Sequence, residues 1–125
     1  MNIARFRGNS IGRNKAVRHA GIVYAVGTAN EAGPDIRAQT AALLEKIDQT
    51  LIEAGSDRSH LLRVQIFLEN MADKPAMDQV WNQWIGPDWQ LWPQRACVGA
   101  PLAEGALIEM VVTAAVKEGA TPSST

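Results

Sequence analysis

The feature that most constrains the fold is one long amphipathic helical segment set among short apolar segments. Between residues 35 and 55, apolar side chains recur at the three- and four-residue spacing of a helix, and Gly55 ends the pattern. The positions expected to face the core are Ile36, Thr40, Leu43, Leu44, Ile47 and Leu51. The positions expected on the polar, exposed side are Arg37, Gln39, Glu45, Lys46, Asp48, Gln49 and Glu53. Such a helix needs an apolar layer to lie on.

Six segments rich in apolar residues are predicted to form that layer as strands. They are residues 2–7, 15–19, 22–26, 61–68, 95–100 and 106–116. Within 61–68, the two-residue alternation predicts one face formed by Leu62, Val64, Ile66 and Leu68. A second helix is predicted for residues 73–84, with Pro75 in its first turn, where a missing N–H does no harm. The order is β-β-β-α-β-α-β-β, which predicts an α+β fold with a mixed six-stranded sheet and two helices on one face.

Length and composition predict one soluble domain. A chain of 125 residues is long enough for one core, and we expect a single domain at 1–117 and a flexible tail at 118–125. With 12 Lys and Arg against 13 Asp and Glu, the chain lacks the charge expected of a nucleic-acid-binding protein. No apolar run reaches the roughly 20 residues that span a bilayer. A single cysteine, Cys97, indicates a reducing compartment, so a cytoplasmic location is expected.

The second face of the sheet is also predicted to be apolar. Two helices cover one face only, and the side chains Leu61, Phe67, Leu107 and Met110 are assigned to the other. A monomer would then expose an apolar patch, which favours a homo-oligomer that packs sheet against sheet. Coverage of this face by loops is the alternative.

Two charged residues lie in the apolar stretch from residue 92 to 116. Arg95 opens one predicted strand and Glu109 lies within the next. An isolated buried charge is costly, so these residues predict either an ion pair between strands or a polar pocket. Cys97 is interpreted as a small buried apolar residue, because no histidine near it in sequence supports a thiolate. His19 and His60 lack metal-ligand spacing, and no metal site is expected.

Five stretches of the sequence resemble one family in its own order and spacing. They are AVRHAGIVYAVGTA, DIRAQTAALLEKIDQTLIEAGSD, HLLRVQIFLENMAD, PQRACV and GALIEM. They are similar to the Rid family (reactive intermediate deaminase, also called YjgF or L-PSP). The resemblance implies a chorismate-mutase-like fold, a homotrimer with a central barrel, and clefts between subunits. It also implies hydrolysis of 2-imino or enamine acids to 2-keto acids and ammonia without a cofactor.

The resemblance assigns roles to residues of this chain. Arg95 matches the arginine that clamps the substrate carboxylate, and Glu109 matches the glutamate that holds the attacking water. Cys97 matches a cysteine whose backbone lies against the substrate nitrogen. Gly27 matches the glycine of a Ser-Gly turn beside the pocket, and Trp84 lies near an aromatic residue of the cleft wall.

The chain departs from the family pattern at three positions. Val26 replaces the hydroxyl residue before the glycine, and Arg13 falls where a tyrosine is usual, which places a second cation near the cleft. Gly99 replaces an acidic or polar residue after Cys-Val. These departures resemble a less-characterised branch of the family.

Two functions remain open from the sequence. The first is a hydrolytic deaminase similar to a 2-iminobutanoate/2-iminopropanoate deaminase, with Arg95 as clamp and Glu109 as general acid/base. The alternative is a non-catalytic trimer that binds carboxylate ligands or has a regulatory role. The family's older ribonuclease label has no support in this composition.

Overall fold

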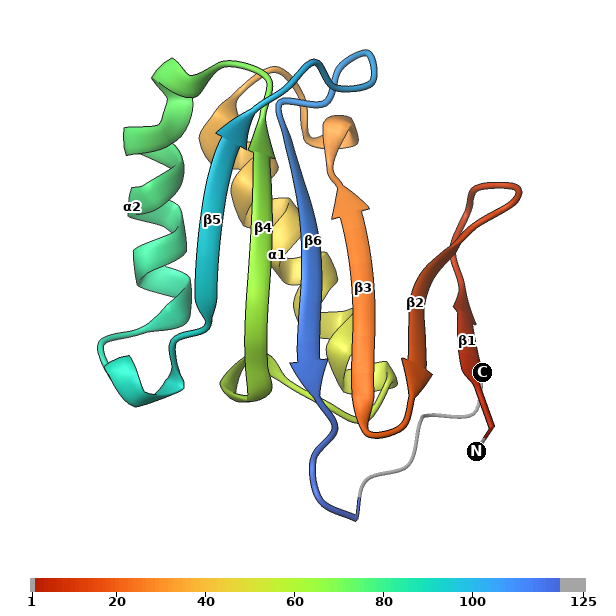
Figure 1. The fold of residues 1–125 in the computed structure, drawn as a ribbon. Helices are drawn as coiled ribbons and strands as arrows, with labels where there is room; N and C mark the ends of the chain where they lie inside the picture. Colours follow the sequence, from red (N-terminus) through yellow and green to blue (C-terminus); the bar gives the residue numbers. More distant parts are fainter. Residues whose placement is uncertain (1, 120–125) are drawn as a thin grey trace.

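The computed structural model describes residues 2–119 as a six-stranded sheet with two helices (Figure 1). The strand order is β1-β2-β3-β6-β4-β5, in which β4 and β5 are parallel and all other neighbours are antiparallel. The strands are β1 (Ala4–Arg7), β2 (Asn14–His19), β3 (Ile22–Thr28), β4 (Leu61–Leu68), β5 (Gln94–Gly99) and β6 (Ile108–Ala115). The helices are α1 (Ile36–Glu53) and α2 (Lys74–Ile85), with short 3-10 turns at Asn30–Ala32, Arg58–His60, Met71–Asp73 and Trp89–Leu91. The predicted mixed sheet and two helices are confirmed.

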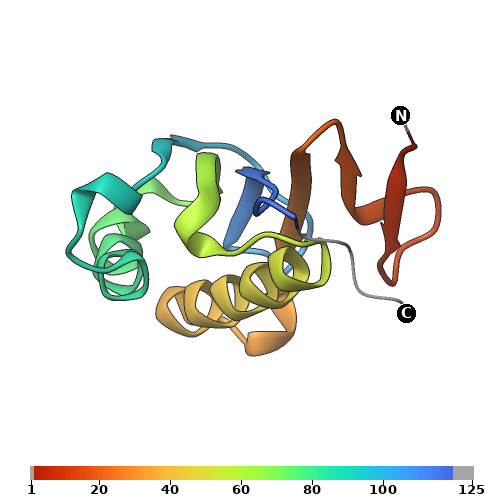
Figure 2. The same ribbon diagram turned by 90° about the horizontal axis from the view of Figure 1, so that it is seen from below.

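Both helices lie on the same side of the sheet. Seen from below, α1 and α2 form one layer beneath β3, β6, β4 and β5, whereas the β1–β2 hairpin extends past them (Figure 2). Asp35 caps α1 by accepting a hydrogen bond from the Arg37 amide at 3.2 Å. Pro75 lies in the first turn of α2, as expected. The hairpin is therefore the part of the sheet without a helix against it.

The core lies between the helices and the sheet. All six α1 positions expected to face it are buried, from Ile36 to Leu51. The strands contribute a second buried set, which includes Val23, Ala25, Val64, Ile66, Leu68, Ile108, Met110, Val112 and Ala114. In β6 the buried residues alternate with half-buried or exposed ones, so this strand separates the two faces of the sheet strictly.

Gln39 was expected on the exposed face of α1, and that prediction is wrong. Its side chain is fully buried and its amide nitrogen donates to the carbonyls of Gly33 and Gly105 at 2.7 and 2.8 Å. Its amide oxygen accepts from the Leu107 backbone N–H at 2.9 Å. One polar side chain thus satisfies three backbone groups and fixes the connection between β5 and β6 to α1.

The predicted face of β4 is wrong at its first two residues. Leu61 is buried and Leu62 is 47% exposed, although the alternation assigned Leu62 to the core. The pairing with β6 shifts between Leu61 and Arg63, so Leu62 is the extra residue of a bulge. Beyond the bulge, Val64 and Ile66 face the core as expected.

The face of the sheet away from the helices, called the open face here, carries apolar residues, although not the whole predicted set. Leu61 and Met110 belong to the helix side, and Leu107 packs against the core. Phe67 is half-buried on the open face, where it pairs with Glu109. The exposed members are Tyr24, Val26, Val98 and Val111, each 40% to 51% exposed. The prediction that this face is an interface between copies of the chain rests on them.

The end of the chain after β6 is only partly described. The Val116 and Lys117 amides donate to the Gly21 and Gly55 carbonyls, both at 2.9 Å, and residues 118–119 form a turn. The predicted tail at 118–125 lies, from residue 120 onward, outside the described residues.

Replacing Gln39 with Ala should lower the free energy of unfolding by about 3 kcal/mol, because three buried backbone groups lose their partners. Gln49→Ala is the matched control, since Gln49 is exposed on the same helix. Urea denaturation at one fixed protein concentration measures both. Equal effects of the two substitutions would contradict the structural role of Gln39.

Candidate functional site

Glu109 projects from β6 onto the open face of the sheet. It pairs with Thr28 of β3 and Phe67 of β4, while its neighbours Ile108 and Met110 point into the core. The side chain is half-buried and makes no hydrogen bond or ion pair with any of the described residues. Its carboxylate is therefore available to a ligand or a water molecule.

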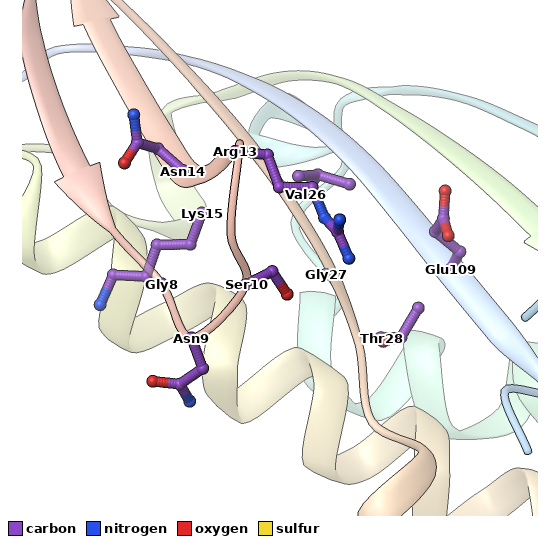
Figure 3. Close-up of a pocket in the computed structure, with 10 residues that line it drawn as sticks. All are labelled: Gly8, Asn9, Ser10, Arg13, Asn14, Lys15, Val26, Gly27, Thr28 and Glu109. Carbon is purple, nitrogen blue, oxygen red and sulfur yellow. The ribbon is translucent and has the colours of Figure 1, made fainter.

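A hollow of about 180 Å³ lies beside Glu109 (Figure 3). Its lining residues are Gly8, Asn9, Ser10, Arg13, Asn14, Lys15, Val26, Gly27, Thr28 and Glu109. The register of β2 with β3 ends at Ala25, so the last three residues of β3 have a strand on one side only. Their other edge borders the hollow, where backbone groups can meet a ligand.

Gly27 belongs to this hollow and also has a packing reason to be glycine. A Cβ at this position would lie 3.1 Å from the Leu43 Cδ1 atom of α1, a closer contact than carbon atoms normally make. Val26 and Thr28, on either side of it, project to the open face. Gly27 therefore allows α1 to approach the sheet directly beneath the hollow.

Two cations border the hollow, and they differ in their partners. Lys15 forms an ion pair with Glu53 of α1 at 2.8 Å. Arg13 is exposed and pairs with none of the described residues. Its side chain extends from the β1–β2 turn over β3, on the side from which Glu109 projects (Figure 3). The structure thus brings Arg13, Gly27 and Glu109 together.

Arg95 lies on the other side of the sheet. Arg95, in β5, pairs with Val64 of β4, and both side chains face the helices. An Arg95 guanidinium nitrogen donates to the Asp78 carboxylate of α2 at 2.7 Å, and its central carbon lies 5.2 Å from the centre of the Trp81 ring. The ion pair between Arg95 and Glu109 that the sequence left open does not form within one chain.

Asp78 is the functional neighbour that the sequence analysis missed. It bridges Arg95 and Lys74, whose ammonium lies 2.7 Å from the second carboxylate oxygen. Burial acts to raise the pKa of Asp78, but hydrogen bonds from Lys74 and Arg95 outweigh it and hold the pKa below its usual value. The available signal was a carboxylate one residue after Met77, an apolar residue that is buried in the structure.

Cys97 and Trp84 lie on the helix side with Arg95. Cys97 packs against the core, and burial raises the pKa of its thiol, an effect that nearby Arg95 offsets only in part. Trp84 donates to Asp48 of α1 at 2.9 Å and lies 5.4 Å from Trp81. Trp84 thus ties the two helices together and does not border the hollow at Glu109.

The predicted site residues therefore form two groups on opposite faces of one sheet. Glu109, Gly27 and Arg13 surround the hollow on the open face, and Arg95 with Cys97 lies on the edge strand β5. Among residues 2–119, no three His, Cys, Asp or Glu side chains gather in a way that could hold a metal ion. Over the same residues, neither helix has the length and apolar character needed to cross a bilayer.

Comparison with known proteins shows the family of this chain. A family model described as Endoribonuclease L-PSP matches residues 6–116. The chain belongs to the L-PSP family. A RutC family protein of Haemophilus ducreyi is 35% identical over 98 residues, which cover 77% of this chain and 82% of that protein. Protein mmf2, mitochondrial, of Schizosaccharomyces pombe is 33% identical over 111 residues, which cover 82% and 86%.

The fold is shared with solved members of the family. The crystal structure of NMB1025 from Neisseria meningitidis, a member of the YjgF protein family, matches with a TM-score of 0.86 and 36% identity. The match covers 94% of this chain and 97% of that one. The resemblance to the Rid, YjgF or L-PSP family and the chorismate-mutase-like fold are thereby confirmed.

Replacing Asp78 with Asn should lower the free energy of unfolding by about 1 kcal/mol at pH 7, because the pair with Arg95 is only partly shielded from water. The pKa of Asp78 is lowered in the folded state, so its stabilising effect is complete above about pH 4, where an unfolded aspartate ionises, and is lost as the pH falls through the folded value. Urea denaturation at pH 7 and at stepwise lower pH measures the difference between wild type and variant.

The matched control for Asp78→Asn is Glu45→Gln, which removes an exposed carboxylate of α1. This control should change the free energy of unfolding by less than about 0.5 kcal/mol at either pH. A difference between wild type and Asp78→Asn that is constant with pH would show that Asp78 does not act through its charge.

Proposed function

We propose that this protein hydrolyses 2-imino acids to 2-keto acids and ammonia in a cleft completed by a second copy of the chain. The observation that carries the proposal is the position of Glu109, a carboxylate that pairs with none of the described residues and lies beside a small hollow in a chain of the L-PSP family. A carboxylate without a partner can hold a water molecule and move its proton. The substrate class comes from the family resemblance.

A second copy is needed because one chain separates the two groups of site residues. β5 is the edge strand of the sheet, so the segment that carries Arg95 and Cys97 can border another copy. The apolar residues of the open face favour sheet-to-sheet packing, as in the predicted homotrimer with a central barrel. In this arrangement, Arg95 of one copy would face the hollow at Glu109 of another, which is the predicted cleft between subunits.

The chemistry follows from these side chains. The Arg95 guanidinium would hold the substrate carboxylate through two parallel hydrogen bonds and keep its charge at any working pH. Glu109 would take one proton from water as the oxygen bonds to the imine carbon, and would pass it to the nitrogen. It would then take the proton of the new hydroxyl group as the C–N bond breaks, and that proton would convert the released ammonia to ammonium. The sum is C=NH₂⁺ plus H₂O giving C=O plus NH₄⁺. These steps need only the side chains and water.

The pair between Arg95 and Asp78 favours a second candidate function. A ligand carboxylate that binds Arg95 must displace Asp78 or share Arg95 with it. In addition, Val26 supplies no hydroxyl group to the hollow. Both features fit a protein that binds carboxylates without turnover and acts as a regulator. In that case, keto acids would raise the melting temperature of the protein while freshly made imino acids would decay at their spontaneous rate.

The endoribonuclease in the family description is not carried over to this chain. The formal net charge is −1 at pH 7. His60 contacts Asp57 and Ser59, at 2.7 and 3.0 Å, in the turn before β4, and His19 lies 3.4 Å from the Asn2 carbonyl. Neither histidine borders the hollow at Glu109.

Glu109→Gln and Arg95→Ala should each lower the rate of ammonia release from freshly generated 2-iminopropanoate by about 10²- to 10⁴-fold, because they remove the proton carrier and the carboxylate clamp. Glu104→Gln, an exposed change in the β5–β6 connection, should leave the rate unchanged. Ammonia and keto acid are measured together against the spontaneous rate. A wild-type rate equal to that of both site variants would sink the deaminase proposal.

A further inference from the structure

The feature that the proposed function leaves unexplained is Arg13. The carboxylate of a 2-imino acid is assigned to Arg95, and the water to Glu109. Arg13 nevertheless lines the same hollow as Glu109 and pairs with none of the described residues. Its neighbour Lys15 has Glu53 as a counter-ion at 2.8 Å, so the two cations of the hollow are not equivalent.

The backbone of the β1–β2 turn directs Arg13 into the hollow. Gly12, just before it, has a φ of +86°, a conformation that glycine adopts readily and other residues rarely do. The turn also contributes Asn9 and Ser10 to the lining, and Asn14 at the start of β2 borders it too. Figure 3 shows the Arg13 side chain extending from this turn over β3, toward the region between Ser10 and Glu109. The Arg13 guanidinium and the Ser10 hydroxyl group therefore lie on one side of the hollow, and the Glu109 carboxylate lies on the other.

The charges of the hollow distinguish between substrates. A monocarboxylic imino acid brings one carboxylate, which Arg95 would hold, and leaves Arg13 without a counter-ion once a second copy closes the cleft. An unpaired guanidinium that loses its water is costly. A substrate with another carboxylate at the end of its side chain would supply that counter-ion, and the nearby Ser10 hydroxyl group could donate a further hydrogen bond to it.

We propose that the preferred substrate is a dicarboxylic 2-imino acid whose distal carboxylate binds Arg13. This inference rests on the proposed deaminase function and narrows its substrate class. The distal carboxylate takes no part in the reaction, so the bonds made and broken are those of the hydrolysis already described. Arg13 is thus a specificity-determining residue.

The test compares 2-iminoglutarate with 2-iminopropanoate, each generated freshly from its amino acid by an oxidase. The wild-type protein should show a higher kcat/KM for 2-iminoglutarate. Arg13→Gln should lower kcat/KM for 2-iminoglutarate by about 10- to 100-fold, the usual effect of losing a charged hydrogen bond. The same substitution should leave kcat/KM for 2-iminopropanoate within about twofold of the wild-type value. Arg5→Gln is the matched control, because Arg5 is an exposed arginine of β1 that does not line the hollow. It should change neither rate.

The outcomes separate this inference from the proposed function. If the wild type hydrolyses both imines and Arg13→Gln lowers both rates equally, or neither, the dicarboxylate proposal is overturned and the deaminase function stands. If the wild type hydrolyses neither, the deaminase function fails. The rise in melting temperature caused by 2-oxoglutarate and by pyruvate then tests whether Arg13 binds a distal carboxylate. Stronger protection by 2-oxoglutarate that is lost in Arg13→Gln supports a dicarboxylate site. Equal protection by the two acids, or protection unaffected by the substitution, overturns it.

Discussion

The alternation of side chains along β6 and its neighbours is the constraint on which the arrangement of the molecule depends. In β6, Ile108, Met110, Val112 and Ala114 face the helices, so the residues between them must face away. Glu109 is one of those residues. Arg95 projects from the opposite face of the sheet, because it pairs with Val64, whose side chain faces the helices. The two charged side chains therefore lie on opposite faces within one chain, and the edge position of β5 is what would let Arg95 approach Glu109 of another copy.

This separation gives the two faces different physical roles. The helix face holds the core, and Arg95 is stabilised at its margin by Asp78 and the Trp81 ring. The open face carries exposed apolar residues next to a polar hollow. Within residues 2–119, neither the carboxylate nor the guanidinium beside this apolar surface has a partner. Such a surface is suited to assembly around a ligand, because the contacts that bind the copies would also remove water from the charged groups.

The sequence predicted the elements well, because they depend on periodicity over many residues. The core positions of α1 and the order of strands and helices both followed from local spacing. The failures were single residues governed by tertiary contacts. Leu61 and Leu62 exchange faces because of a bulge in the β4–β6 pairing, which no alternation within β4 reveals. The candidate site residues came from the family resemblance, and their assignment as a site stays a prediction. Their division between two faces depended on the strand register.

Two buried or half-buried polar side chains were missed for the same reason. Gln39 has the residue type of an exposed helix position, and only the approach of the 33 and 105–107 segments gives its amide three partners. Asp78 likewise acquires its importance from Arg95, a residue 17 positions away in the sequence. Partners brought together by the tertiary fold leave little trace in local patterns.

The contact between Asp78 and Arg95 also has a consequence for how strongly any anion binds at β5. Asp78 acts as a tethered competitor, present at a fixed high local concentration, so an incoming carboxylate gains only the difference between its own interaction and the one it displaces. The apparent affinity is the intrinsic affinity multiplied by the fraction of molecules in which Arg95 is accessible. If Arg95 binds a substrate carboxylate as proposed, this competition would favour ligands that add further contacts elsewhere in the cleft over anions that bind Arg95 alone.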